Sequence, residues 1–353
     1  MTKKNETVIL VSSLAMTLAL VGGVYFWVSQ TTSVPNILHS GNKTDNQTDI
    51  EKPNPSDSST FAKVSNVPSG LFRYGGSTTW APIRAEVDSI IKAVYPQFGL
   101  IYTAPVTGTP GTDTGIRMLI DNQLVFSQAS RSLQAEEYQQ AQQKGFTLKE
   151  IPVAVDGIAV AVHPNLDIPG LTLAQLRDIY TGKLTNWNQL GSKKNLPIVA
   201  YSRSIEDGGT VEFFVKNVLG KEKLTKNIQF TSDTTEALRN ISKKSGGIYY
   251  ASAPEIVGQC GVKPLPVGRK PDKLIPPYQE PFVPLSECPK KRNQVNIQAF
   301  QSQENQYPIT RQLFVIIKQN AQTEQQAGEA YANLLLTNQG QELITKAGFV
   351  RIK

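Results

Sequence analysis

At two places in the chain a pair of glycines is followed directly by a hydroxyl residue and then by an amphipathic segment. The first place reads "YGGSTTWAPI" (74–83) and the second reads "YSRSIEDGGTVEFFVKNVLG" (201–220). Backbone N–H groups, hydroxyls and a helix N-terminus together favour negative charge, so the chemistry suggested is capture of an oxyanion. Each stretch alone could equally be a helix N-cap after a flexible approach. The residues concerned are Ser77, Thr78, Thr79, Gly208, Gly209 and Thr210.

Two further segments show related features. "TGTPGTDTGIRM" (107–118) places Thr112 and Thr114 at the start of a predicted helix. "SQASRSL" (127–133) places Ser130 and Arg131 after a short predicted strand, where open α/β sheets present ligand-binding loops. Any one of these segments is more often a cap or a turn, but four in one chain predict an anion site.

Arg203 precedes the second glycine pair and offers the planar fork that suits an oxyanion bidentately. Glu206 and Asp207 would repel an anion if they faced it, so we expect one of them to pair with Arg203 and orient it. The alternative is a surface loop with a scattered salt bridge.

The elements that must position these residues alternate between helix and strand. Residues 81–94, "APIRAEVDSIIKAV", have helical spacing of apolar positions. Residues 151–163 form an almost continuous β-branched run, typical of a strand buried on both faces in a parallel sheet. "LTLAQLRDIY" (171–180) opens with a capping box, and "QLFVIIK" (312–318) predicts a late strand before terminal helices. This alternation predicts an α/β sheet with helices on its faces.

The N-terminus predicts export. Lys3 and Lys4 precede about twenty mostly apolar residues, long enough to span a bilayer as a helix. We interpret 1–29 as a membrane anchor or signal segment, with an uncleaved anchor favoured, and 30–68 as a flexible linker. The positive-inside rule then places the rest outside the cytoplasm, at the periplasmic or extracytoplasmic face. The chain would be secreted if the signal were cleaved.

Composition and cysteines narrow the function further. A net charge of +7 suits an anionic partner, which could be nucleic acid, a membrane surface or a small oxyanion. Cys260 and Cys288 predict a disulfide in an oxidising compartment, the alternative being two separate buried thiols. No nucleophile with a base is recognisable, and His39 and His163 have no partner at metal-ligand spacing. We therefore expect no enzyme, metal or cofactor.

From about residue 68 to its end, the chain resembles the phosphate-binding proteins of ABC transporters, PstS-like members of the type II periplasmic-binding fold. The resemblance rests on "GGSTTWAPI", "LTLAQLRDIYTGKLTNWNQLG", "SRSIEDGGT" and "YPITRQLFVIIK". It implies two lobes joined by a hinge, one made of 69–154 plus 255–353 and the other of 155–254. It also implies a monomer that captures inorganic phosphate and passes it to permease subunits, with no nucleic-acid partner.

The resemblance implies contacts from the four loops, through Thr78 and Thr79, Thr112, Ser130, and then Arg203, Gly209 and Thr210. Where family members often have an Asp after the serine of the third loop, this chain has Arg131. That Asp would accept the proton that phosphate keeps and sulfate lacks. Either Asp113 or Asp207 supplies the acceptor instead, or Arg131 tightens binding at some loss of discrimination. A membrane-tethered oxyanion sensor or scaffold, with relaxed or lost specificity for sulfate-like anions, is the alternative function.

Overall fold

The computed structural model describes residues 60–205, 208–301, 306–320 and 322–352, all within one compact unit, Pro55–Lys353. The predicted anchor (1–29) and residues 30–59 of the predicted linker (30–68) lie outside the described residues. Within the described ranges, no helix is both long and apolar enough to cross a membrane.

Strands and helices alternate along most of the chain, which confirms the predicted mixed α/β class. The strands are β1 (Gly70–Gly76), β2 (Phe98–Tyr102), β3 (Phe126–Ala129), β4 (Thr147–Val162), β5 (Leu171–Thr172), β6 (Val199–Ser202), β7 (Gln229–Phe230), β8 (Gly247–Ser252), β9 (Lys263–Leu265), β10 (Val267–Lys270), β11 (Lys273–Ile275), β12 (Thr310–Gln319) and β13 (Val350–Arg351). The longer helices are α2 (Ala81–Val94), α3 (Thr112–Ile120), α4 (Ala135–Gln143), α5 (Leu173–Tyr180), α7 (Thr234–Lys243), α10 (Thr323–Leu335) and α11 (Asn338–Lys346). Short helical segments are η2 (Phe61–Lys63), η3 (Thr78–Trp80), η4 (Trp187–Leu190), α6 (Gly209–Phe214), η6 (Val215–Leu219), α8 (Ala253–Ile256) and α9 (Ile297–Gln301).

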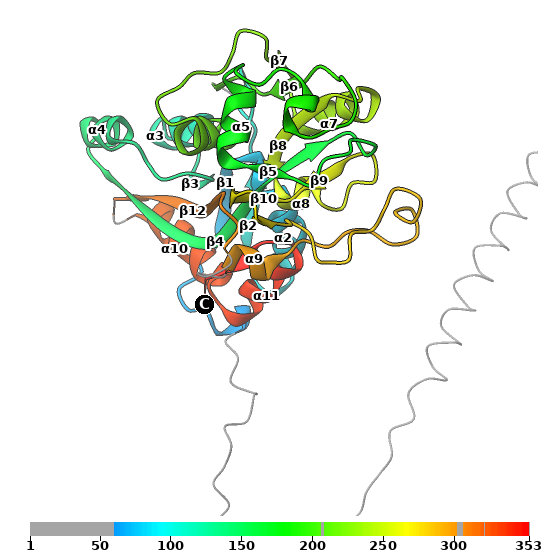
Figure 1. The fold of residues 1–353 in the computed structure, drawn as a ribbon. Coiled ribbons are helices and arrows are strands. Elements are labelled where there is room, and N and C mark those ends of the chain that lie inside the picture. Colours follow the sequence, from blue (N-terminus) through cyan, green and yellow to red (C-terminus); the bar gives the residue numbers. More distant parts are fainter. Residues whose placement is uncertain (1–59, 206–207, 302–305, 321, 353) are drawn as a thin grey trace, which may run out of the picture. The chain divides into compact units, whose positions relative to one another are not determined.

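Within the described ranges, ten strands join one sheet, and its main path runs β2-β1-β3-β12-β4-β8-β6-β7. β1 pairs in parallel with β2 and β3, and β8 pairs in parallel with β6. In Figure 1 the segments from α5 to α7, drawn in green, gather at the top, whereas α2, α10 and α11 gather at the bottom. The C-terminal helices therefore return to the N-terminal part of the fold, where Lys346 pairs with Glu86 at 2.8 Å.

The long strand β4 links the two halves of this sheet. Its first part pairs with β12 up to Gly157, and from Ile158 onward it pairs with β8. Every neighbour of β4 is antiparallel to it, so the parallel pairing predicted for 151–163 is wrong. The apolar run reflects burial alone, because Ile158 to Val162 lie inside a packed core whatever the direction of the adjacent strands. At the change of partner, a Cβ on Gly157 would lie 2.5 Å from the Phe300 ring, so a larger residue would clash there.

Separate hydrophobic cores lie on either side of this change of partner. One core gathers the second part of β4 with α5, α6 and β8. Another packs β1, α2, α10 and one face of β12. A smaller third core joins α3 to the opposite face of β12.

The predicted disulfide is confirmed: Cys260 and Cys288 are bonded, with their Cα atoms 5.5 Å apart. It connects the residues after α8 to the Pro-rich segment before α9. Within that region β10 pairs with β5 and β11 in a small separate sheet.

Candidate oxyanion-binding site

The first glycine-hydroxyl loop runs closely past β3 between β1 and α2. Gly76 has a φ of +117°, and a Cβ there would lie 2.3 Å from a backbone oxygen of β3, so this path needs glycine. The Trp80 indole N–H then donates to the carbonyl of Ala129 at 3.0 Å. These contacts hold Ser77 and Thr79 in the interior, where each is at most 3% exposed.

Hydroxyls from three loops meet at Ser130, directly after β3. The Ser130 hydroxyl lies 3.1 Å from the Ser77 hydroxyl and 3.1 Å from the Thr112 hydroxyl. The backbone N–H of Ser130 also donates to Thr112 Oγ1 at 3.1 Å. Thr112 Oγ1 accepts that bond, and in the contact between the two hydroxyls either Thr112 or Ser130 can be the donor.

The fourth loop reaches the same point through a glycine. A Cβ on Gly209 would lie 2.7 Å from both Ser130 Oγ and Thr112 Oγ1, so only glycine allows the start of α6 to approach this closely. The next residue, Thr210, places its hydroxyl 3.4 Å from that of Thr79. We call Ser77, Thr79, Thr112, Ser130 and Thr210 the hydroxyl cluster.

Arg311, on β12, contacts this cluster. Its side chain is 1% exposed, and its Nη2 donates to Thr79 Oγ1 at 3.0 Å and to Thr210 Oγ1 at 2.9 Å. The motif "YPITRQLFVIIK" predicted only a strand and the family resemblance, so Arg311 was not predicted as a site residue. The signal in the sequence is an arginine just before the apolar run of a strand, because a buried arginine needs a partner.

That partner is Asp156, which faces Arg311 across the β4–β12 pairing. Arg311 Nε and Nη2 lie 3.0 and 2.9 Å from Asp156 Oδ2, and the Ser252 hydroxyl donates to Asp156 Oδ1 at 2.6 Å. Burial raises the pKa of Asp156, while the guanidinium and the Ser252 hydroxyl act in the opposite direction. The pair lies one residue before the point where β4 changes from β12 to β8.

Arg131 lies beside the cluster, but its guanidinium is fully occupied. Nε donates to Glu212, Nη1 donates to the Ser132 carbonyl and to Glu137, and Nη2 donates to Asp113 and to Glu137. These bonds use all five N–H groups that an arginine has. Burial lowers the pKa of Arg131, but the bonds and charges of the surrounding carboxylates outweigh burial and raise it overall.

The carboxylates around Arg131 outnumber its single positive charge. Burial first, and then the charge of Asp113, raise the pKa of Glu212, whereas Arg131 lowers it. The Glu137 carboxylate also accepts from the backbone N–H of Gln134, which fixes it at the start of α4. We call Arg131 with Asp113, Glu137 and Glu212 the Arg131 cluster.

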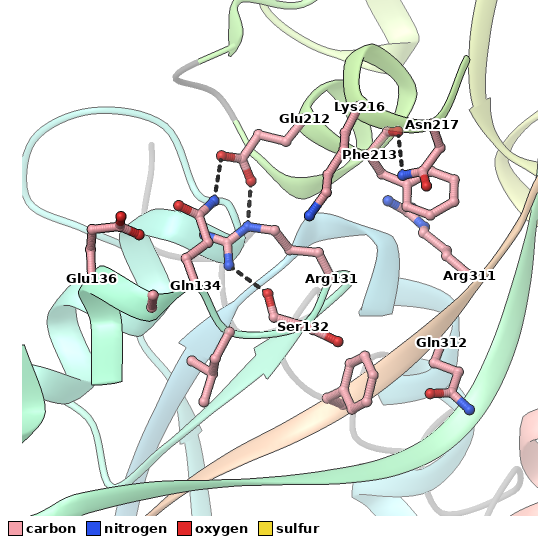
Figure 2. Close-up of a pocket in the computed structure, with 13 residues that line it drawn as sticks. Arg131, Ser132, Gln134, Glu136, Glu212, Phe213, Lys216, Asn217, Arg311 and Gln312 are labelled. Carbon is pink, nitrogen blue, oxygen red and sulfur yellow. Dashed lines mark hydrogen bonds and ion pairs between the residues drawn. The ribbon is translucent and has the colours of Figure 1, made fainter. Parts of the chain in front are cut away.

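Arg131 and Arg311 line opposite parts of one hollow of about 580 Å³ (Figure 2). Phe213 and Lys216, which follow Glu212, cover it from above, and the Lys216 amine points into the space between the two arginines. The hollow adjoins the hydroxyl cluster through Arg311.

Other predicted site residues are not members of the hydroxyl cluster. Thr114 donates to the carbonyl of Thr109 at 3.0 Å and so stabilises its own loop. Thr78 is half-buried in η3, and Arg203 is half-buried after β6. Residues 206–207, including the predicted acceptor Asp207, lie outside the described residues, so their pairing with Arg203 stays a prediction.

Gly208 packs against the second loop. A Cβ on Gly208 would lie 3.3 Å from the Cα of Gly111, the residue before α3, and its φ of +133° also favours glycine. The loop before α6 and the loop before α3 therefore approach each other through glycines.

Comparison with known proteins gives this geometry a family context. A sequence family described as a PBP superfamily domain matches residues 54–339. The chain belongs to the PBP superfamily. This PBP superfamily chain is 27% identical over 248 residues to the phosphate-binding protein PstS of Staphylococcus aureus strain USA300, covering 69% of this chain and 68% of the relative. It is 31% identical over 177 residues to PstS of Staphylococcus haemolyticus, covering 50% and 54% of the two chains. The resemblance stated from the sequence motifs is confirmed.

Solved structures give the same result. A putative phosphate ABC transporter substrate-binding protein from Clostridium perfringens, with bound phosphate, superposes with a TM-score of 0.62 at 26% identity, covering 80% of this PBP superfamily chain and 100% of that protein. An ABC-type phosphate transport receptor from Vibrio cholerae superposes with a TM-score of 0.56 at 20% identity, covering 79% and 99%. Because its identity is only 20%, the likeness to the Vibrio cholerae protein shows a shared fold and nothing more.

Proposed function

We propose that this chain captures inorganic phosphate between two lobes and delivers it to the permease of an ABC transporter for import. The observation that carries the proposal is the hydroxyl cluster, where hydroxyls from four separate loops meet in the interior. Similarity to proteins named PstS supports phosphate as the anion.

The proposed ligands are the hydroxyls of the cluster, together with Arg203 and the backbone at Thr78, Gly208 and Gly209. Charge-assisted hydrogen bonds contribute roughly 1.5 to 3 kcal/mol each, so a handful offsets the cost of binding and reaches the about 8 kcal/mol of a micromolar complex. Arg131 has no N–H group left for an anion, and Thr114 is committed to its own loop. We therefore favour the hydroxyl cluster over these two residues as the direct contact.

Binding would close the two lobes on the anion. We take 69–154 with 255–353 as one lobe and 155–254 as the other, so Thr79 and Thr210 approach each other from different lobes. The change of strand partner at Gly157 supports a hinge in β4. We further propose that the receptor is monomeric, and that residues 1–29 hold it at the outer face of the membrane.

The anion's remaining proton needs an acceptor if phosphate is to be preferred over sulfate. Asp113 is our proposed acceptor, since its carboxylate stands beside Thr112 at the start of α3. Its bond to Arg131 leaves further acceptor positions on the carboxylate.

Calorimetric titration of the purified full chain with phosphate, and separately with sulfate, tests this function. The chain is first unfolded and refolded with its disulfide intact, which removes any anion carried through purification. Tight phosphate binding with weak sulfate binding is the expected result. Comparable binding of both anions would indicate a sensor with relaxed specificity, and binding of neither would leave the scaffold as the function.

A further inference from the structure

Of the two arginines Arg131 and Arg311, only Arg311 keeps N–H groups without a hydrogen-bond partner among the described residues. Its Nη1 is buried and has no hydrogen-bond partner among the described residues. The Phe213 ring is the nearest aromatic face, with its centroid 5.9 Å from the guanidinium carbon. A buried charged donor without an acceptor costs more free energy than a neutral one, so this group points to an acceptor outside the described residues, such as a bound oxyanion.

The bonds that Arg311 does make prepare the cluster for an anion. Thr79 and Thr210 each accept a hydrogen bond from Nη2, so their hydroxyl hydrogens can turn from the 3.4 Å contact between the two hydroxyls to a bound anion. An oxyanion has only acceptors to offer, so hydroxyls oriented as donors suit it. Arg311 thus orients two hydroxyls of the cluster, those of Thr79 and Thr210, as donors.

Asp156 holds the guanidinium in this position. It is completely buried, it binds both Nε and Nη2, and Ser252 occupies its other oxygen. The pair has no net charge, so it can remain in the interior without a bound anion. The planar fork is fixed with Nη2 toward the hydroxyls.

We propose that Arg311 contacts the bound oxyanion directly through its guanidinium, and that Asp156 is the positioning residue that aims it. This inference rests on the proposed function, because it assigns a further ligand to the same site. It gives the site a cation from the β12 side, in addition to Arg203 on the loop before α6.

The test compares phosphate titrations of the full chain and of the variants R311Q, D156N and R311Q/D156N, each with its denaturant unfolding curve. The double variant removes both charges, so it separates a ligand role from a purely structural ion pair. R269Q is the matched control, since Arg269 is an exposed residue of β10 and its loss changes the net charge equally.

We expect R311Q and the double variant each to weaken phosphate binding by about 100-fold, the range of a lost charge-assisted bond. The double variant should be more stable than R311Q, which leaves the Asp156 carboxylate buried without its partner. D156N should stay within about tenfold of the parent affinity, because the guanidinium remains. R269Q should bind as the parent does.

Two results would overturn the inference while leaving the proposed function intact: a folded R311Q that binds within about threefold of the parent, or a double variant that regains the parent affinity. The second would show that Arg311 serves only to neutralise Asp156. Absence of phosphate binding by the parent chain would instead refute the proposed function, and this inference with it.

Discussion

Two arginines flank the same hydroxyl cluster, yet their surroundings differ in charge and in completeness. Arg131 donates all five of its N–H groups to protein oxygens, and three carboxylates surround it. Within the part of the chain that the structure describes, Arg311 has one carboxylate partner, Asp156, and its Nη1 has no hydrogen-bond partner. Arg131 therefore has a structural role, whereas Arg311 has N–H groups available for a ligand.

Burial follows the same division. The carboxylates of the Arg131 cluster are 13% to 31% exposed, so water screens part of their charge. Asp156 and the Arg311 side chain are 0% and 1% exposed. Electrostatic interactions are stronger where water is excluded, so an anion gains more beside Arg311 than beside Arg131. A basic residue in a loop therefore cannot be assigned as an anion contact until its own hydrogen-bond partners are known.

The largest expected effect comes from closing the space at the hydroxyl cluster itself. In G209A the added methyl group would lie 2.7 Å from the hydroxyl oxygens of Ser130 and Thr112, which forces the start of α6 away from them. We expect phosphate binding to weaken by at least about 100-fold, with little change in the unfolding midpoint. Calorimetry measures the first quantity and denaturant unfolding the second.

G258A is the control for this substitution. A Cβ on Gly258 would meet only the Asn293 carbonyl oxygen, at 3.9 Å, so phosphate binding should not change. Normal phosphate binding by G209A would mean that the anion does not lie at this cluster.

A substitution in the Arg131 cluster should have a smaller effect, and it should change stability and not phosphate binding. E137Q removes the carboxylate that binds Arg131 through both oxygens, at 3.0 and 2.8 Å. We expect the free energy of unfolding to fall by about 1 to 2 kcal/mol, and phosphate affinity to change by less than about threefold. E136Q, at the exposed neighbouring position, should change neither quantity. Loss of phosphate binding in E137Q without loss of stability would remove the distinction between the two arginines.

Asp113 belongs to the Arg131 cluster but is also the proposed proton acceptor, so it tests where the two regions overlap. D113N should lower the preference for phosphate over sulfate by about tenfold, because an amide no longer repels sulfate. Parallel titrations with the two anions measure this ratio, and D121N, at an exposed aspartate paired with Lys144, is the control. An unchanged ratio would eliminate Asp113 as the acceptor.

The smallest effect is on pH dependence. Because the pKa of Glu212 is raised above its ordinary value of 4.5, the folded chain binds more protons than the unfolded chain just above that pH. The free energy of unfolding should therefore fall as the pH rises through this window. E212Q should remove this decline, a difference below about 1 kcal/mol because the carboxyl group is partly screened by water. Identical profiles of unfolding free energy against pH for the parent and E212Q would mean that burial and Asp113 do not raise the pKa of Glu212.

Local sequence patterns were enough to predict the glycine-hydroxyl loops and the α/β class. Gly76 and Gly209 stand out in the sequence as members of glycine pairs. In the structure each lies at a close approach that a larger residue would block. The direction of β4 was not predictable, since an apolar run reports burial and not the orientation of its neighbours.

The role of Arg311 was not predictable for a related reason. Its partner Asp156 lies 155 residues away in the chain, and only the register of β12 against β4 brings the two together. The role of Arg131 was equally unpredictable, because the carboxylates that bind it come from α3, α4 and α6. Position in a motif identified both loops, but long-range pairing decided what each arginine can do.

A crystal structure of the chain with bound phosphate would show which of the two arginines contacts the anion. We expect the anion to lie among Ser77, Thr79, Thr112, Ser130 and Thr210, within hydrogen-bond distance of Arg311, while Arg131 keeps its carboxylate partners. Phosphate bound to Arg131 in place of one of those carboxylates, with Arg311 out of reach, would contradict it.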